Sequence, residues 1–256
     1  MQRVGVIPAR WKSRRFPGKP LADILGKSLV QRTYEQAAQS QLLDALVVAT
    51  DDHRILDHVH SFGGKAFMTS ESCPTGTDRT AEVIGSHFPE AEIVVNLQGD
   101  EPLLDPRVID TLIEKLEATP DALLTTPVTR ILDREEVANP SIVKCVFDSF
   151  GRALYFSRAP IPYSHFQKEM PDAYRHIGVY CFRREFLFTY QTLLEGPLQR
   201  AEDLEQLKIL EMGKPIHVCL VEEGGVGVDT PEELKKVEEI LCKENISSSQ
   251  VVSSPL

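Results

Sequence analysis

Short apolar runs alternate with amphipathic stretches along the first half of the chain. The apolar runs have the length of single strands and are almost continuous, which is typical of strands buried on both faces of a parallel sheet. They are Val4–Ile7, Ala45–Ala49, Lys65–Met68, Ile93–Leu97 and Leu123–Val128. The stretches between them have helical spacing and lie at Leu29–Ala38, Asp52–Phe62, Asp78–His87 and Pro106–Leu116. This alternation predicts an α/β fold with a doubly wound, mostly parallel sheet.

The second half of the chain breaks this alternation. The turn residues 149–151 separate two apolar runs, 142–147 and 153–157, which predicts a β-hairpin. Further strands are expected at His176–Phe182 and Ile216–Val221, and further helices at Phe186–Leu194, Glu202–Met212 and Pro231–Cys242.

A hairpin added to a parallel sheet suggests a lid or a dimerisation element rather than a separate domain. We therefore expect one domain over residues 1–243, with an insertion of this kind at about 130–200. The polar residues 244–256 are expected to form a disordered tail.

The charge of the chain excludes one class of partner. Its 256 residues include 28 Lys and Arg and 38 Asp and Glu, so the net charge is 28 − 38 = −10. General nucleic-acid binding needs a basic surface that replaces counterions, so we expect no nucleic-acid partner. No apolar stretch approaches the roughly 20 residues of a membrane span, so no membrane insertion is expected either. The five cysteines are scattered without a Cys-x-x-Cys pair, which favours reduced thiols in a cytoplasmic protein.

The loop after the first predicted strand is strongly basic. Ligands of open α/β sheets bind beyond the carboxyl ends of the strands, and this loop lies there. It contains no acid and five cations, which are Arg10, Lys12, Arg14, Arg15 and Lys19. Cations together with free backbone amides can hold a polyphosphate, so we favour phosphate binding over a merely solvated basic loop. Gly26–Ser28 has only the tail of a Walker motif, because Leu21 stands where its first glycine should be. Gly225–Thr230 is only a near-match to a dinucleotide fingerprint.

Two aspartates follow other strands of the predicted sheet. Asp100 lies in the Gln98–Pro102 loop, and Asp229 follows Gly227 after the last strand. Carboxylates close to a phosphate loop are the ligands that Mg²⁺ prefers. Asp229 also directly precedes Thr230-Pro231, so the residues leave metal binding and helix capping about equally open for it. His176 opens a predicted strand, where a histidine packed in the core is the more frequent case.

A set of motifs, in order along nearly the whole chain to about Lys243, resembles one family. The sequence is similar to the 3-deoxy-manno-octulosonate (Kdo) cytidylyltransferases, also called CMP-Kdo synthetases. The matching segments are 7–21, 49–51, 75–79, 95–102, 139–144, 153–158, 175–180, 202–207 and 227–232. CMP-sialic acid synthetases share the fold and the chemistry, but Arg15 and Pro17–Leu21 fit the Kdo enzymes better.

The resemblance implies a nucleotide-diphospho-sugar transferase-like, Rossmann-like fold and a cytoplasmic homodimer with CTP and Kdo as substrates. It implies that Asp100 and Asp229 hold Mg²⁺ and act with Arg10 and Lys19 in catalysis. The nucleotide site it implies consists of Pro8, Ala9, Arg10, Ser13, Arg15, Lys19, Thr75, Gly76, Arg79 and Gln98. The sugar-acid site it implies consists of Arg158, His176, Tyr180, Glu205 and Gln206.

Two other functions stay open at this point. A nucleotide-binding module without turnover would also use the basic loop, although paired acids and a second polar pocket argue against it. A dehydrogenase is disfavoured because, in the segment Gly225–Thr230, Thr230 stands where a dinucleotide-binding fingerprint has its third glycine.

Overall fold

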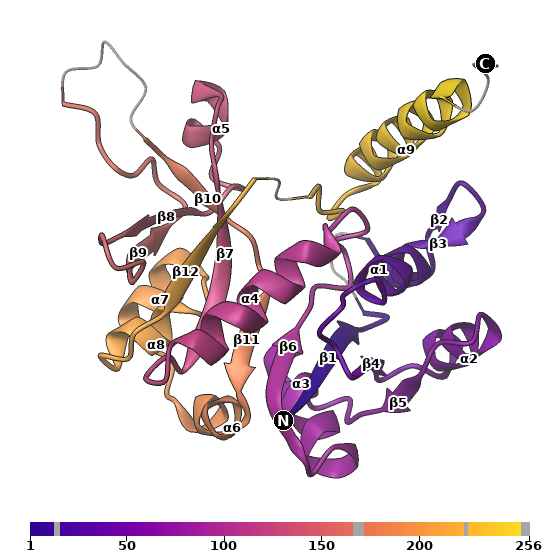
Figure 1. Ribbon diagram of the computed structural model, residues 1–256, viewed down its shortest axis with the longest axis horizontal. Coiled ribbons are helices and arrows are strands. Elements are labelled where there is room, and N and C mark those ends of the chain that lie inside the picture. Colours follow the sequence, from indigo (N-terminus) through magenta and orange to yellow (C-terminus); the bar gives the residue numbers. More distant parts are fainter. Residues whose placement is uncertain (13–15, 166–171, 223–224, 252–256) are drawn as a thin grey trace.

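The computed structural model describes residues 1–12, 16–165, 172–222 and 225–251, the last eight of these by their backbone only. Its first half is a doubly wound sheet, as predicted (Figure 1). Strand β1 (Gln2–Ala9) pairs in parallel with β4 (Ala45–Thr50) on one side and with β6 (Ala91–Asn96) on the other. Strand β5 (Ala66–Met68) lies outside β4. The strand order therefore reverses between β1 and β6, and such a switch point is where α/β sheets bind ligands.

Helices cover both faces of this sheet. On one face, α1 (Leu29–Ala37), α2 (His53–Ser61) and α4 (Pro106–Ala118) bury apolar side chains against the strands. On the other face, α3 (Gly76–His87) and α6 (Arg184–Thr192) form a second core. The alternation of side chains along β1 supplies both cores: Val4 and Val6 point into one, and Ile7 and Ala9 into the other.

The second half extends the sheet beyond β6. Strand β7 (Leu124–Arg130) runs parallel to β12 (His217–Val221), and α5 (Arg134–Ala138) follows β7. Strands β8 (Lys144–Phe147) and β9 (Ala153–Ser157) pair antiparallel, which confirms the predicted hairpin. In Figure 1 these strands lie on one side of the molecule and the first sheet strands on the other.

The single strand expected at His176–Phe182 is wrong, because the chain breaks it in two. Strands β10 (Tyr174–His176) and β11 (Tyr180–Arg183) both pair with β7, but β10 has β8 as its other neighbour and β11 has β6. The side-chain amide of Gln98 donates to the carbonyl oxygen of Gly178 at 2.7 Å, in the gap between the two strands. The break thus lies where the sheet changes partners, next to the β6 loop.

The helix expected at Glu202–Met212 is also interrupted. Helix α7 (Pro197–Glu202) ends where Asp203 adopts a left-handed backbone conformation, with φ of 52°, and α8 (Leu207–Glu211) follows. The Glu202 carboxylate accepts hydrogen bonds from the Ser157 hydroxyl at 2.6 Å and the Arg158 amide at 2.8 Å. These bonds to β9 hold the end of α7 in place, so tertiary contacts override the local helical pattern.

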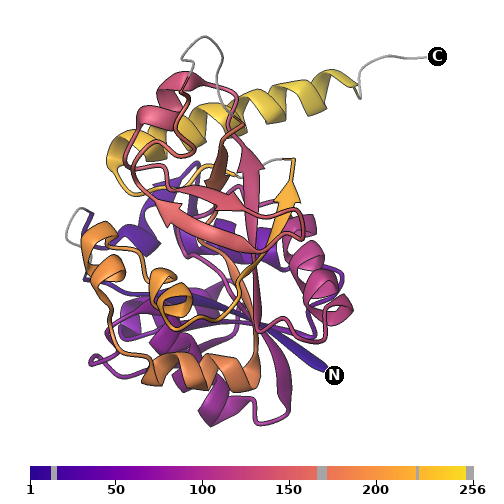
Figure 2. The same ribbon diagram turned by 90° about the vertical axis from the view of Figure 1, so that its left-hand side faces the viewer.

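The last helix runs into the segment 244–256 that is expected to form the tail. Helix α9 begins at Pro231 and continues to Val251 (Figure 2), while residues 252–256 lie outside the described part. No Gly or Pro interrupts residues 232–254, so nothing in the sequence ends the helix near Lys243. No helix in the described part of the chain is both long and apolar enough to cross a bilayer.

One buried cation fixes the start of the hairpin. The side chain of Lys144 is fully buried, and its Nζ donates to the carbonyl oxygens of Asn139 (2.9 Å), Ile142 (2.7 Å) and Arg158 (2.6 Å). Burial lowers the pKa of this ammonium group, because the charged form loses its hydration. The three carbonyl groups replace that hydration and fasten the 139–142 turn to the end of β9.

Replacing Lys144 by Met keeps the aliphatic length but leaves three carbonyl groups without their donor. We expect the free energy of unfolding to fall by about 3 kcal/mol, as is typical when buried polar groups lose their partners. Chemical denaturation would measure the loss. Lys65→Met, at an exposed position just before β5, is the control and should change stability by less than about 0.5 kcal/mol. Equal effects of the two substitutions would contradict the assigned role.

Candidate active site

Three loops from strands far apart in the sequence meet at the carboxyl edge of the sheet. The Nζ of Lys19, at the end of the β1 loop, lies 2.6 Å from Oδ2 of Asp100 and 3.1 Å from Oδ1 of Asp229. The same ammonium group donates to the carbonyl oxygen of Val228 at 2.9 Å. A backbone hydrogen bond of 2.8 Å from the amide of Val228 to the carbonyl of Asp100 ties the last two loops together. Lys19, Asp100 and Asp229 therefore form one cluster, hereafter the Lys19 cluster.

The Lys19 ammonium group is charged in this setting. Burial of its side chain, 14% of which is exposed, would by itself lower its pKa. The two carboxylates outweigh that effect and raise the pKa above its ordinary value. The Lys19 cluster thus keeps a fixed positive charge at neutral pH.

Asp229 does not cap the helix that follows it. The hydroxyl of Thr230 accepts from the amide of Glu233 at 3.3 Å, and the Glu233 carboxylate accepts from the amides of Asp229 (2.7 Å) and Thr230 (2.9 Å). This reciprocal arrangement is a capping box, and it satisfies the start of α9 without the Asp229 side chain. The side chain of Asp229 therefore points to Lys19 instead.

The end of β1 is enclosed by two glycines. A Cβ at Gly99 would lie 2.9 Å from the carbonyl oxygen of Pro8, and one at Gly76 would lie 3.1 Å from the Pro8 ring. The β6 loop can approach β1 this closely because residue 99 is a glycine, and a side chain at residue 76 would crowd the Pro8 ring. Pro8, Gly76 and Gly99, separated in the sequence, meet here. Ala9 is buried beside them, whereas Arg10 is exposed at the start of the loop.

Several residues expected in the nucleotide site form hydrogen bonds with other groups of the protein. The Thr75 hydroxyl caps α3 by accepting from the amide of Asp78 at 3.1 Å. The buried guanidinium of Arg79 pairs with the Asp51 carboxylate at 2.8 Å and with the hydroxyl of Thr69. Gln98 faces the break between β10 and β11. Ser13 and Arg15 lie outside the described residues.

The expected sugar-acid residues gather on the other side of the β6 loop. Tyr180, Glu205 and Gln206 line a small cavity of about 10 Å³, together with Thr77 and Tyr190. The Glu205 carboxylate accepts from the Tyr190 hydroxyl at 3.0 Å and from that of Thr77 at 3.4 Å. Burial raises the pKa of Glu205. A cavity of this size has room for about one water molecule, so a sugar acid could enter only if these side chains moved.

His176 and Arg158 are held by the protein itself. Nε2 of His176 lies 2.9 Å from the hydroxyl of Thr126, and burial lowers the pKa of this imidazole to about 3. Its ring packs against Phe156 and Tyr180, so it is a neutral core group. The Arg158 guanidinium donates to the carbonyl oxygen of Glu202 at 2.7 Å and more weakly to two others.

The structure also brings two residues to the cluster that the sequence reasoning did not single out. Glu101 is 8% exposed, and its Oε2 has no hydrogen-bond partner among the described residues. Burial, with the neighbouring Asp100 charge, raises the pKa of Glu101 to about 8. Arg175 is half-buried and interacts electrostatically with Glu101, and its guanidinium donates no hydrogen bond to any described residue.

One sequence signal could have indicated Arg175. Side chains alternate across a strand, so Arg175 and His176 must face opposite sides of β10. Since His176 points into the core with Val128, its pairing partner on β7, Arg175 faces the other side. For Glu101, the only signal in the sequence is that it directly follows Asp100.

The donor set of the Lys19 cluster is chemically suited to Mg²⁺. Asp100 and Asp229 supply hard oxygen ligands that already converge on a cation, and Mg²⁺ is commonly held by one or two carboxylates plus phosphate oxygens. Within the described residues no group of three or more His, Cys, Asp or Glu side chains is arranged to hold a metal alone. Phosphate oxygens of a substrate would have to complete the coordination.

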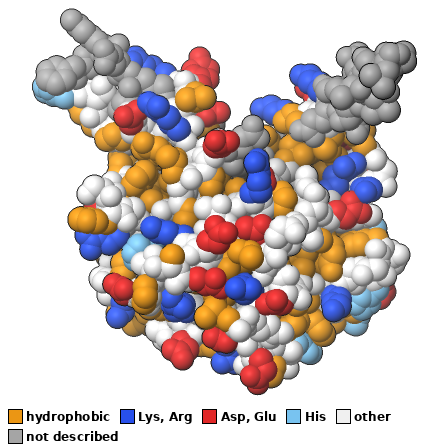
Figure 3. All heavy atoms as spheres, viewed as in Figure 1, with side chains coloured by type: hydrophobic (Ala, Val, Ile, Leu, Met, Phe, Trp, Pro, Cys, Tyr) orange, Lys and Arg blue, Asp and Glu red, His pale blue; other side chains and the backbone are white. Residues whose placement is uncertain are grey.

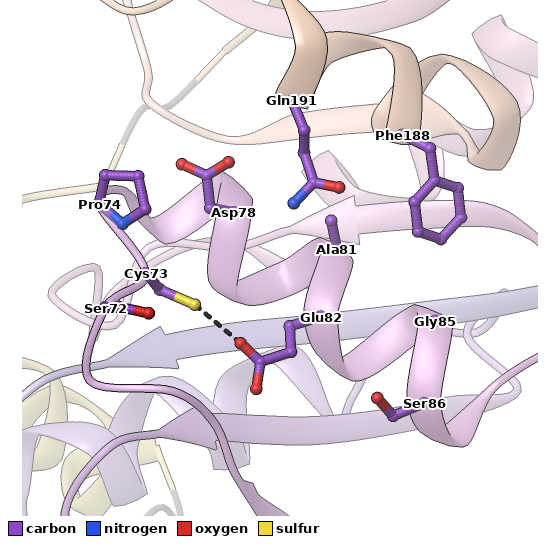
Figure 4. Close-up of a pocket in the computed structure, with 10 residues that line it drawn as sticks. All are labelled: Ser72, Cys73, Pro74, Asp78, Ala81, Glu82, Gly85, Ser86, Phe188 and Gln191. Carbon is purple, nitrogen blue, oxygen red and sulfur yellow. Dashed lines mark hydrogen bonds between the residues drawn. The ribbon is translucent and has the colours of Figure 1, made fainter.

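A separate pocket lies elsewhere and is not part of this cluster. It has a volume of about 470 Å³ and is formed by α3, α6 and the segment before α3 (Figure 4). Its Glu82 carboxylate is already bound, accepting from the Cys73 thiol at 2.9 Å and the Ser70 amide at 2.8 Å. On the face seen in Figure 3, by contrast, the surface is hollowed beside the start of α9, and acidic and basic side chains are both exposed there.

Comparison with known proteins agrees with this geometry. A family model described as cytidylyltransferase matches residues 4–216. A 3-deoxy-manno-octulosonate cytidylyltransferase of Chlamydia pneumoniae is 58% identical over 243 residues, covering 94% of this chain and 95% of that protein. The chain belongs to this family. The enzyme of the same name from Protochlamydia amoebophila (strain UWE25) is 54% identical over 249 residues, which cover 95% of this chain and 96% of that one.

Solved structures of cytidylyltransferases have the same fold as this chain. CMP:2-keto-3-deoxy-manno-octonic acid synthetase in complex with CTP superposes with a TM-score of 0.90 at 43% identity, covering 95% of this chain and all of that one. A cytidylyltransferase from Leptospira borgpetersenii, at 16% identity and a TM-score of 0.63, covers 100% of this chain and 99% of that one. At that identity the second likeness concerns the fold alone.

Proposed function

We propose that this chain transfers the cytidylyl group of CTP to 3-deoxy-D-manno-octulosonate, forming CMP-Kdo and diphosphate. The observation that carries the proposal is the identity of 58% to a 3-deoxy-manno-octulosonate cytidylyltransferase over 94% of the chain. The Lys19 cluster supports it, because it gathers a cation and two carboxylates at the switch point of the sheet, as a nucleotidyl transfer requires.

In this reaction the anomeric 2-hydroxyl oxygen of Kdo attacks the α-phosphorus of CTP and gives up its proton to water. The new P–O bond forms as the bond to the diphosphate oxygen breaks. The difficulty is charge, since an anionic sugar must approach a triphosphate. Lys19 and Arg10 would lower that repulsion and stabilise the charge that develops on the leaving diphosphate. Ser13, Arg15 and Gln98, with the segment of Thr75, Gly76 and Arg79, would complete the nucleotide site.

Mg²⁺ is part of the proposal. Asp100 and Asp229 would hold the ion, and when bound it would neutralise phosphate charge. For the acceptor, we propose that Tyr180, Glu205 and Gln206 bind the sugar. We propose that Arg158 or His176 binds the carboxylate of the sugar. Both side chains are hydrogen-bonded within the protein, so the one that binds the sugar must first leave those partners.

A pyrophosphate-release assay tests the function. We expect release from CTP only when Kdo and Mg²⁺ are present, loss of release with EDTA, and little activity with other nucleotides. A stronger response to sialic acid than to Kdo would favour the CMP-sialic acid synthetase reaction. CTP binding without release in the presence of any sugar acid would favour a binding module.

We also propose that the protein is a cytoplasmic homodimer whose product enters lipopolysaccharide synthesis. Support for the dimer comes from two exposed leucines, Leu154 on β9 and Leu220 on β12, with 62% and 61% of their surfaces exposed. The amide of Ala153 donates to the carbonyl of Ile216 at 2.8 Å, so the start of β9 lies next to the start of β12. Leu154→Lys is expected to shift the sedimentation coefficient from dimer to monomer. An unchanged coefficient would contradict this interface.

A further inference from the structure

The two ends of the basic loop are joined by a contact that lies outside the Lys19 cluster. The amide of Gly18 donates to the carbonyl oxygen of Trp11 at 3.1 Å. Trp11 directly follows Arg10, and Gly18 directly precedes Lys19. This one hydrogen bond therefore brings together the neighbours of two cations that are nine positions apart.

The Trp11 side chain strengthens the same junction. Gly18 has a left-handed φ of +72°, and a Cβ there would lie 3.0 Å from Cη2 of the indole. The indole thus packs directly against the backbone of Gly18, where a side chain would be strained by the backbone conformation and crowded by the indole.

Arg54 contacts the same indole. Its Cζ lies 3.4 Å from the ring centroid, a close cation–π contact. The guanidinium is itself held by the Asp52 carboxylate, with contacts of 2.9 and 2.6 Å, and Asp52 caps α2 just after β4. A chain of contacts therefore runs from the end of β4 through Arg54 and Trp11 to Gly18.

We propose that Trp11, Gly18 and Arg54 form a clasp that positions Arg10 and Lys19 for the triphosphate. The clasp residues act through the two cations and not on the reacting atoms. The inference rests on the proposed nucleotide role of this loop. Trp11 is the only tryptophan of the chain, so its emission reports on this junction alone. Indole emission depends on contact with charged groups, and nucleotide phosphates that engage Arg10 and Lys19 should change it.

Kinetics of three variants test the clasp. Trp11→Ala and Arg54→Ala should each raise the KM for CTP about tenfold, within the range that a close cation–π contact contributes. The kcat should stay within about threefold and the KM for Kdo should not change. Trp11→Phe keeps an aromatic face and should restore the KM for CTP to within about twofold of the unaltered chain.

Arg107→Ala is the matched control. Arg107 stands two residues after the capping Asp105 of α4, as Arg54 stands two residues after Asp52 in α2. It should leave the KM for CTP unchanged. Values for Trp11→Ala and Arg54→Ala within twofold of the unaltered chain, with normal thermal midpoints, would overturn the proposal.

Fluorescence separates this proposal from the proposed function. Titration of the unaltered chain with CTP and Mg²⁺, without Kdo, should change Trp11 emission saturably, and Arg54→Ala should shift the half-saturation about tenfold higher. Constant emission in a protein that does release diphosphate would overturn the clasp alone. A saturable change in a protein that never releases diphosphate with Kdo would contradict the proposed reaction and leave the clasp standing.

Discussion

Replacing Lys19 by Met is expected to lower kcat/KM for CTP by about 10³-fold, which corresponds to about 4 kcal/mol of transition-state stabilisation. The ammonium group is the cation that the loops after β1, β6 and β12 share, and its side chain is 14% exposed. Methionine keeps the length of the side chain and removes the charge. Steady-state pyrophosphate release with varied CTP measures the loss.

Lys27→Met is the control for this substitution. Lys27 lies in the short strand β3 (Lys27–Ser28), which pairs with β2 (Asp23–Ile24) shortly after the 3₁₀ turn Lys19–Leu21. Its ammonium group pairs with Glu35 at 2.6 Å and is 46% exposed. The control should leave kcat/KM unchanged. A Lys19→Met enzyme within threefold of the unaltered one would remove Lys19 from the phosphate site.

Asp100→Asn should reduce kcat by about 10³-fold while CTP binding stays within about fivefold. The amide is isosteric with the carboxylate but binds a hard cation poorly, so the change removes charge and keeps shape. Asp105→Asn makes the same chemical change at the cap of α4, where Asn caps as well as Asp, and should be silent. Steady-state kinetics would measure kcat, and isothermal titration with CTP would measure the binding constant.

The Mg²⁺ dependence distinguishes two roles of Asp100. If Asp100 holds the ion, the Mg²⁺ concentration at half-maximal activity should rise strongly in Asp100→Asn. If Asp100 only orients Lys19, that concentration should not move, and Lys19→Met combined with Asp100→Asn should be no worse than either single variant. Near-normal kcat in Asp100→Asn would exclude both roles.

Elements with a strong local pattern were predictable. The buried strands β1, β4 and β6 and the helices between them follow directly from apolar runs and helical spacing, and the β8–β9 hairpin follows from its turn residues. Prediction failed where tertiary contacts override the local pattern. Gln98 bonds Gly178 between β10 and β11, and Glu202 bonds β9 at the end of α7. Neither partner can be found from the residues next to it.

For the candidate site the division is similar. The rule that ligands bind beyond strand ends selected Lys19, Asp100 and Asp229, and these side chains do meet. The sequence left capping and metal binding equally open for Asp229, and the capping box of Thr230 and Glu233 decided the first of these. Arg175 was overlooked in favour of its neighbour His176, although strand alternation could have separated them.

By itself the sequence determined which residue types stand at the ends of which strands, because apolar periodicity and turn residues act over a few positions. Only the tertiary structure decided which of those ends touch. The contact between Gly99 and Pro8 and the shared ammonium group of Lys19 join segments up to 210 positions apart. Such contacts arise from the packing of the whole sheet, and no short stretch of sequence encodes them.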